Sequence, residues 1–189
     1  YSAAASDVYK RQIPHTHPAP HPVVAAARAQ GVNIIGDIEL LKRSVPEARY
    51  VGITGTNGKS TTTALSGHIM TTAGGPVQVG GNLGRPALDL DPLERGGTYV
   101  LELSSFQLEL TTDGGFDVAV LLNITPDHLE RHGGMAGYIA AKRLIFKNNS
   151  VAMIVGIDDP ECAAICANLQ NFYHKTWFRI LEFPWKRRC

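Results

Sequence analysis

The stretch VGITGTNGKST at residues 51–61 decides the fold of this chain. Its first residues belong to an apolar run typical of a buried strand, and a helical pattern begins at Lys59. Between the two, glycines let the backbone turn so that successive N–H groups point at one anion, and the new helix adds its positive N-terminal end. The sequence therefore predicts a phosphate-binding loop that joins a strand to a helix.

Each residue type in this loop has an expected task. Lys59 would reach the β and γ phosphates of a nucleotide, and the hydroxyl of Ser60 would hold magnesium. The motif is not a strict Walker A sequence, because Ile53 stands where GxxxxGK[ST] has its first glycine. A plain glycine turn would explain the glycines but not the Lys-Ser-Thr that follows them. The predicted nucleotide-binding residues are Gly55, Thr56, Asn57, Gly58, Lys59, Ser60 and Thr61.

Around the loop, short apolar runs alternate with longer helical patterns, which is typical of a parallel sheet wrapped by crossover helices. Strands are expected at residues 50–54, 77–79, 99–103, 118–122 and 151–157. Helices are expected at residues 59–73, 135–147 and 160–169, with shorter ones at 22–30 and 38–43. The predicted fold class is α/β, a mostly parallel sheet flanked by helices with a P-loop, and incomplete.

The bulk composition is that of an ordinary globular protein. Hydrophobic residues make up 44% of the 189 residues, charged residues 19%, and the formal net charge is +1, so there is no bias toward nucleic acid or membrane. No apolar run approaches the ~18 residues of a membrane span and no signal peptide is visible, so a cytoplasmic location is expected. Three cysteines cannot form an even disulfide set, and we expect Cys162 and Cys166 to be buried on a helix.

The two ends of the chain differ from its middle. Residues 7–12, DVYKRQ, are what GAT GTG TAT AAG AGA CAG encodes, and this string resembles a transposon end used in sequencing libraries. Residues 1–12 are therefore expected to be non-native sequence. Residues 170–189 hold both tryptophans and a basic cluster, and are expected to be a non-native tail. The alternative is a basic amphipathic tail for a membrane surface or nucleic acid.

Several segments resemble the Mur ligase and folylpolyglutamate synthase superfamily in the same order. After ITGTNGKST come GGNLGRPAL at 80–88, LELSSFQLEL at 101–110, LLNITPDHLERHGG at 121–134 and AAK at 140–142. Spaced motifs in one order are more specific than any single motif. The resemblance implies that residues 13–48 lead in from an N-terminal domain and that residues 49–169 form part of an ATP-binding Mur ligase central domain.

Members of this superfamily join a carboxylate to an amine with ATP. The motifs are most similar to those of members that join D-glutamate to UDP-N-acetylmuramoyl-L-alanine, through an acyl phosphate, in peptidoglycan precursor synthesis. The resemblance thus implies ATP and magnesium as cofactors, these two substrates as partners, no nucleic acid or membrane, and a monomeric full-length enzyme. Because the uridine and D-glutamate sites lie outside the match, the fragment is expected to be inactive alone. A sister Mur or folylpolyglutamate-type ligase, or a non-catalytic nucleotide-binding module, stays open.

The resemblance also implies roles for single residues. Ser60, Glu102 and His128 would be magnesium ligands, and Lys142 would bind a second magnesium through a carbamate formed with carbon dioxide. Lys59, His128 and Lys142 would be the catalytic residues. Glu102 would close a strand at its carboxyl end, where open α/β sheets bind ligands, and a carboxylate suits a hard cation.

The implied substrate contacts are Asn82, Ser104 and Ser105. Each implied site residue also has a plainer explanation when it is taken alone. Asn82 could be a turn former, and Glu102 a strand-end carboxylate in water. His128 could be a loop or helix-start residue, and Lys142 a solvated lysine on a helix surface.

Overall fold

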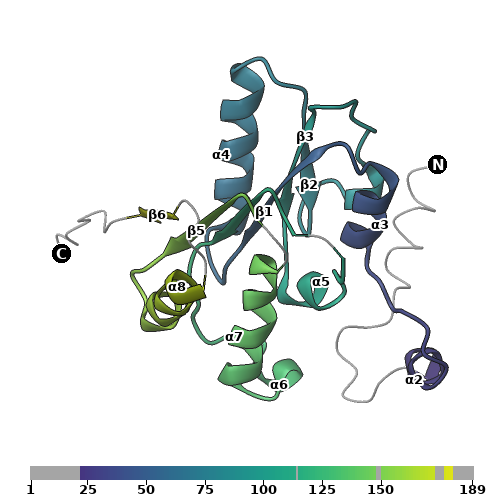
Figure 1. The fold of residues 1–189 in the computed structure, drawn as a ribbon, viewed down its shortest axis with the longest axis vertical. Coiled ribbons are helices and arrows are strands. Elements are labelled where there is room, and N and C mark those ends of the chain that lie inside the picture. Colours follow the sequence, from purple (N-terminus) through teal and green to yellow (C-terminus); the bar gives the residue numbers. More distant parts are fainter. Residues whose placement is uncertain (1–21, 114, 148–149, 173–176, 181–189) are drawn as a thin grey trace. The chain divides into compact units, whose positions relative to one another are not determined.

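The computed structural model describes residues 22–113, 115–147, 150–172 and 177–180. It divides into two compact units, Tyr1–Ile34 and Ile35–Cys189. The first unit contributes helix α2 (Pro22–Ala29) to the described part. The second unit holds the sheet and the remaining described helices (Figure 1).

Six strands form one parallel sheet in the order β2-β3-β1-β4-β5-β6. The chain leaves β1 toward one side of the sheet and later passes from β3 over β1 to the other side. Such a reversal of direction is where open α/β sheets form their ligand crevice, at the carboxyl ends of the strands. The strands are β1 (Arg49–Thr54), β2 (Val77–Gly81), β3 (Thr98–Glu102), β4 (Val118–Leu121), β5 (Ala152–Gly156) and β6 (Trp177–Ile180).

Helices cover both faces of this sheet (Figure 1). Helix α4 packs on β1, β2 and β3, whereas α5, α7 and α8 lie on the opposite face. Right-handed crossovers require helices on both faces. The connection from β1 to β2 crosses the sheet in one direction, whereas the connections from β3 to β4 and from β4 to β5 cross it in the other. The helices of this unit are α3 (Asp37–Ser44), α4 (Lys59–Thr72), α5 (Ser105–Glu109), α6 (Leu129–His132), α7 (Met135–Arg143) and α8 (Pro160–Phe172), with short 3-10 turns at Ala87–Asp89 and Leu144–Phe146.

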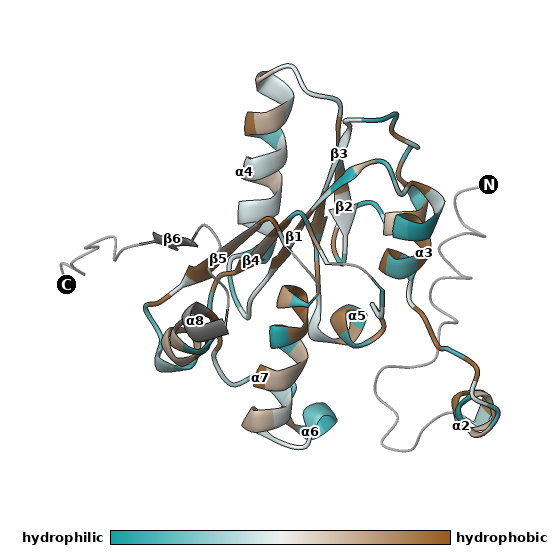
Figure 2. Ribbon diagram, viewed as in Figure 1, coloured by the Kyte–Doolittle hydropathy of each residue, from teal (hydrophilic) through white to brown (hydrophobic). Residues whose placement is uncertain are grey.

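Hydrophobic residues of the central strands, brown in Figure 2, form two clusters with residues of the helices. A smaller cluster centres on Ile53, Val100 and Val120, with Met70 of α4 against it. A larger cluster on the other face includes Leu101 and many residues of the helices there. Strands covered on both faces are apolar at successive positions, which explains their uninterrupted hydrophobic sequence.

The predicted α/β fold with a parallel sheet is confirmed, and the expected strands and helices are present with shifted ends. The helix expected at 135–147 ends at Arg143, and a 3-10 turn continues to residue 146. Helices α5 and α6 were not predicted, because they have only five and four residues. Strand β6, which pairs with β5, lies inside the segment 170–189 that was expected to be non-native. The origin of that segment stays a prediction.

Other expectations concern the cysteines and the chain ends. Cys162 and Cys166 are buried, unpaired residues of α8, as expected. Residues 1–12 lie outside the described part of the chain. Among the described helices, none has the length and hydropathy that crossing a bilayer would require.

A buried carboxylate fastens helix α3 to the segment after α5. Glu39 is 1% exposed and accepts hydrogen bonds from Arg43 Nε at 2.8 Å and from the backbone N–H groups of Thr112 and Asp113. A buried charge is tolerated when it is paired and fully hydrogen-bonded. Gln107 of α5 also donates to Asp37 at 3.1 Å. Helix α3 is therefore part of the same unit as the sheet.

Gly52 in the middle of β1 offers a test of this packing. A Cβ there would come within 2.8 Å of Phe116 and 2.9 Å of Leu103. We expect Gly52→Ala to lower the free energy of unfolding by about 1–3 kcal/mol, because the core would be overpacked. Gly75→Ala is the matched control, since its nearest neighbour would be 3.6 Å away. Urea denaturation measures both, and equal stability of the two variants would contradict the described packing of β1.

Candidate functional site

The site is built around the loop between β1 and α4. The loop runs from Gly55 to Gly58, and Gly58 has φ +79°, a left-handed conformation that glycine adopts without strain. A Cβ at Gly55 would lie 3.0 Å from Leu122 Cβ, so this glycine lets the loop approach the segment after β4. Helix α4 begins directly after the loop, and its first N–H groups have no acceptor within the helix.

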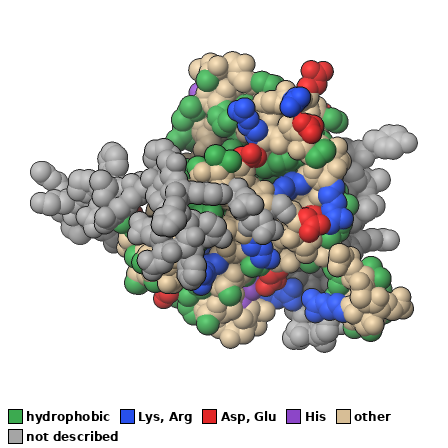
Figure 3. Space-filling view, in the orientation of Figure 1, with side chains coloured by type: hydrophobic (Ala, Val, Ile, Leu, Met, Phe, Trp, Pro, Cys, Tyr) green, Lys and Arg blue, Asp and Glu red, His purple; other side chains and the backbone are tan. Residues whose placement is uncertain are grey.

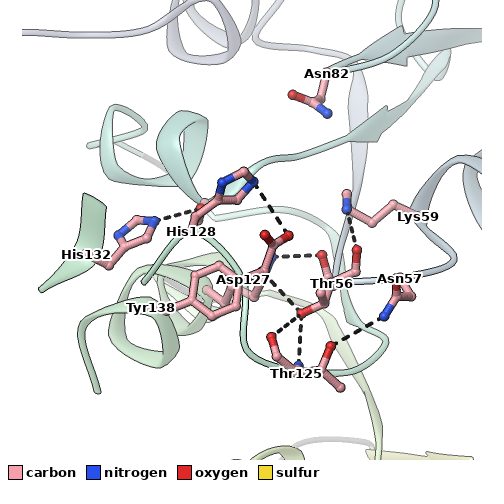
Figure 4. A network of polar contacts seen from close by, with 12 residues as sticks. Thr56, Asn57, Lys59, Asn82, Thr125, Asp127, His128, His132 and Tyr138 are labelled. Atoms are coloured by element: carbon pink, nitrogen blue, oxygen red, sulfur yellow. Dashed lines mark hydrogen bonds and ion pairs between the residues drawn. The ribbon is translucent and has the colours of Figure 1, made fainter. Parts of the chain in front are cut away.

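The segment after β4 holds the loop in shape through paired hydrogen bonds (Figure 4). Asn123 Oδ1 accepts from the backbone N–H of Asn57 at 2.8 Å, and Asn123 Nδ2 donates to Asn57 O at 3.0 Å. The Thr56 hydroxyl donates to Thr125 O at 3.1 Å and accepts from Thr125 N–H at 3.0 Å. Tyr138 OH lies 3.2 Å from the same hydroxyl. Thr56 and Asn57 therefore fix the loop conformation, which leaves the start of α4 to face a ligand.

The three hydrophilic residues that open α4 differ in exposure. Lys59 is half-buried, and its Nζ donates to Thr56 O at 2.9 Å, so its side chain turns back over the loop (Figure 4). Ser60 and Thr61 are exposed in the first turn. All three stand at the positive end of the helix, where an anion is stabilised.

Glu102 ends strand β3 beside Asn82. Glu102 is 3% exposed, which excludes the alternative of a carboxylate facing water. Its Oε1 accepts from Asn82 Nδ2 at 2.9 Å, and its backbone O accepts from Asn82 N–H at 2.9 Å. Within the described part of the chain, no basic side chain forms an ion pair with Glu102. A buried carboxylate without a cationic partner is costly, and a bound cation would remove that cost.

Lys142 is also buried, at 2% exposure on helix α7, so it is not the solvated surface lysine of the plainer explanation. Its Nζ donates to Gly55 O at 2.8 Å and lies 3.4 Å from Thr54 Oγ1. The amine also lies 4.8 Å from the centre of the Tyr138 ring. The chain thus places an amine directly beneath the glycine loop.

His128 precedes helix α6 as its N-cap, so the helix-start interpretation of this residue is correct. It has φ +50°, which is uncommon for a residue with a side chain. Its ring lies 5.4 Å from the Phe106 ring, and its Nε2 lies 3.6 Å from Asp127 Oδ2. The side chain is 54% exposed and therefore accessible to a ligand.

Ser104 and Ser105 have different surroundings. Ser104 caps α5, because its hydroxyl accepts from Gln107 N–H at 3.2 Å while Gln107 Oε1 accepts from Ser104 N–H at 3.1 Å. Ser105 is 2% exposed, and its hydroxyl lies 2.9 Å from His132 Nε2. Burial lowers the pKa of His132, an effect that the nearby Glu109 opposes. In this structure both hydroxyls are engaged within the protein, and substrate contact by either one stays a prediction.

The predicted residues come together only in part. Asn82 and Glu102 are in contact, and Lys142 touches the loop that carries Lys59. In Figure 4, Asn82, His128 and Lys59 lie around one region above the loop. Among the described residues, however, no group of three or more His, Cys, Asp or Glu side chains is close enough to hold a metal ion.

The sequence did not indicate four residues that shape the site: Asn123, Thr125, Asp127 and Tyr138. A usable signal was present for the first three, because NITPD directly follows a strand of the predicted sheet. Carboxyl ends of parallel strands share one edge, so this segment is expected at the same edge as the glycine loop. The visible described surface carries basic and acidic side chains side by side (Figure 3).

Comparison with known proteins identifies the family. Residues 53–181 match the Mur ligase middle domain. The chain is 57% identical over 166 residues to a UDP-N-acetylmuramoylalanine--D-glutamate ligase of Paramagnetospirillum magneticum, a match that covers 87% of this chain and 36% of that protein. It is 59% identical over 165 residues to the enzyme of the same name from Rhodospirillum rubrum, with 84% and 35% covered. The chain therefore spans just over a third of the length of these curated relatives.

Solved structures show the same fold at lower identity. MurF ligase from Thermotoga maritima in complex with ADP has a TM-score of 0.57 and 23% identity, covering 76% of this chain and 35% of that one. A UDP-N-acetylmuramate:L-alanyl-gamma-D-glutamyl-meso-diaminopimelate ligase from Neisseria meningitides has a TM-score of 0.59 and 16% identity, covering 85% and 55%. With the middle-domain match over more than half of its length, this chain belongs to the Mur ligase family.

Proposed function

We propose that this chain is the nucleotide-binding part of a ligase that joins D-glutamate to UDP-N-acetylmuramoyl-L-alanine with ATP. The observation that carries the proposal is the 57–59% identity to relatives of that name over most of this chain. The geometry supports it, because a glycine loop, a helix start, a lysine and a buried carboxylate meet at one edge of the sheet. The same identity favours D-glutamate over the amino acids of sister ligases. Because the reaction consumes ATP, we place it in the cytoplasm.

In the proposed reaction, a carboxylate oxygen of the UDP-N-acetylmuramoyl-L-alanine substrate attacks the γ phosphorus of ATP, and ADP leaves. The amine of D-glutamate then attacks the carbonyl carbon of the acyl phosphate, and inorganic phosphate leaves. The first step brings two anions together, so stabilising charge is the main task of the protein. Lys59 and the N–H groups that open α4 are placed to do this. No nucleophile from the protein is needed.

Three residues at this edge carry groups that would hold magnesium. Glu102 offers a buried carboxylate, Ser60 an exposed hydroxyl and His128 an accessible imidazole. Magnesium would neutralise phosphate charge during transfer. Asn82 would orient the Glu102 carboxylate, since it already donates to one of its oxygens.

Lys142 is suited to react with carbon dioxide. Burial, with a further effect from the charge of Lys59, lowers the pKa of Lys142 from 10.5 to about 8. A neutral amine is the nucleophile that adds to carbon dioxide and releases one proton, and a lowered pKa makes it more abundant near neutrality. The resulting carbamate keeps one N–H, which could still donate to Gly55 O, and gains anionic oxygens for a second magnesium.

The loop assignment is tested by nucleotide binding. We expect Lys59→Ala to weaken magnesium-dependent binding of a non-hydrolysable ATP analogue by about 10- to 100-fold, the effect of losing a charge-assisted hydrogen bond. Calorimetric titration of the parent chain and variant measures this. Lys147→Ala is the control, because Lys147 lies in the connection that leads to the start of β5, at the opposite edge of the sheet. Equal affinity of parent and Lys59→Ala would remove the basis of the proposal.

The lowered pKa of Lys142 predicts a pH effect on stability. Above about pH 8 the folded protein releases this proton, whereas the unfolded chain holds it up to about pH 10.5. Deprotonation of Lys142 in the folded protein therefore makes the free energy of unfolding increase with pH between about pH 8 and pH 10.5, by at most ~1.4 kcal/mol per pH unit. Lys142→Met should lack this contribution. Urea denaturation from pH 8 to about pH 9.5, below the range where tyrosines titrate, compares the two in buffer free of carbon dioxide. Parallel curves would contradict the prediction.

The whole reaction is proposed for a ligase of the length of the curated relatives. We expect these 189 residues alone to release no phosphate from ATP with both substrates present, because the chain spans about a third of its relatives. A phosphate-release assay decides this. Clear turnover would show that the described part suffices for catalysis.

A further inference from the structure

A histidine that the proposed function does not use has a buried side chain between two polar groups of helix α5. The side chain of His132 is 1% exposed. Its Nε2 lies 2.9 Å from Ser105 Oγ, and its Nδ1 lies 3.3 Å from Glu109 Oε1. Its ring stacks on Phe106 and is tilted against Tyr138, with 5.4 Å between centroids in both pairs. Both ring nitrogens therefore face polar atoms of helix α5.

The order serine, histidine, glutamate would suit a hydrolytic nucleophile, but the burial argues against that role. A nucleophilic hydroxyl must reach the substrate, whereas Ser105 is 2% exposed and faces the His132 ring. The rings of Phe106 and Tyr138 both pack against that ring. The Ser105 hydroxyl and the His132 ring are buried, whereas Glu109 is 39% exposed, so the effect of these contacts is on the position of the elements that they join.

Helix α6 depends on such contacts because it has little stability of its own. It contains four residues, far fewer than a helix needs to persist alone. Figure 2 shows it as hydrophilic, and no residue in it is fully buried. Its start, His128, and the residue after its end, Gly133, both have left-handed conformations. Two side chains of α6 pack against the rest of the protein: His132, whose side chain is 1% exposed, and Leu129, which is partly buried against the larger hydrophobic cluster.

His132 is linked to His128 through one turn of backbone. The His132 N–H donates to His128 O at 3.4 Å, and Arg131 N–H donates to the same oxygen at 3.1 Å. Both histidine rings lie 5.4 Å from the Phe106 ring. Gly137 of α7 allows a close fit on the other side, since a Cβ there would collide with His132 O. A fixed His132 thus fixes His128 against α5.

We propose that His132 is a positioning residue whose contacts with Ser105 and Glu109 set the place of His128 relative to Glu102. Ser105 follows Glu102 by three residues, so the contact reaches from the end of β3 to the start of α6. The inference rests on the proposed function, in which His128 and Glu102 hold magnesium. His132 itself need not touch nucleotide or metal.

The first readout needs no ligand. Ring-proton resonances of His128, assigned with His128→Ala, report its distance from Phe106 through the ring current of Phe106. We expect His132→Leu to shift them toward random-coil values and His132→Gln to restore most of the shift, because a glutamine amide can still accept from Ser105. His68→Leu, a change at an exposed histidine of α4, is the matched control and should leave them unmoved. Unchanged resonances in His132→Leu would overturn the proposal even if the chain bound no nucleotide.

The second readout separates positioning from general stability. In chains that melting curves show to be folded, we expect His132→Leu to raise the magnesium concentration for half-maximal binding of the ATP analogue about tenfold, as loss of an outer-shell partner does. In the His128→Ala background the same change should have no further effect. An unchanged magnesium requirement, or an equal increase in that background, would overturn the proposal. A parent chain without magnesium-dependent binding would contradict the proposed function instead, and the resonances would then decide about His132.

Discussion

The parallel direction of the strands is the constraint on which the candidate site depends. Because the strands run the same way, every strand ends at one edge, and the residues after β1, β2, β3 and β4 must meet there. Strand β1 lies between β3 and β4, so its loop has a neighbouring strand end on each side. One neighbour supplies Glu102 and the other supplies Asn123 and Thr125. The loop is thereby shaped by one side and faces a buried carboxylate on the other.

Burial of charge gives this edge its chemical character. Glu102 and Lys142 are 3% and 2% exposed, and both would be expensive to bury without compensation. Lys142 reduces the cost through its contact with Gly55 O and through a pKa lowered to about 8, whereas among the described residues the Glu102 carboxylate accepts a hydrogen bond from the Asn82 amide alone. A fold selected for stability alone would place apolar residues here, since a buried charge rarely adds net stability. The two side chains thus point to binding or chemistry at this edge.

The sequence was sufficient to predict the fold class, because its apolar runs alternate with helical patterns at the spacing of βαβ units and the glycine loop joins the first strand of the sheet to a helix. Helix α5 escaped prediction since its five residues are too few to show a period, and α6 for the same reason. The sequence was enough to place the loop residues and Glu102 at strand ends. It did not allow the burial of Lys142 to be predicted. On helix α7 its alanine-rich surroundings give no amphipathic signal, and only packing against Tyr138 and the loop encloses it. His132 was equally invisible, because its partners come from a helix 27 residues earlier in the chain.

The described residues supply few oxygen ligands for a cation, and this has a consequence for the proposed function. Magnesium takes about six oxygen ligands, and the protein ligands proposed here are one carboxylate, one hydroxyl and one imidazole. Among the described residues, no three His, Cys, Asp or Glu side chains lie close enough together to hold a metal ion. The missing ligands must then come from water, phosphate oxygens or a carbamate on Lys142. Metal and nucleotide would therefore strengthen each other's binding, since such coupling is reciprocal. A small displacement of His128 would therefore weaken magnesium binding more than it would in a site rich in carboxylates. Each protein ligand here provides a larger share of the coordination of the ion.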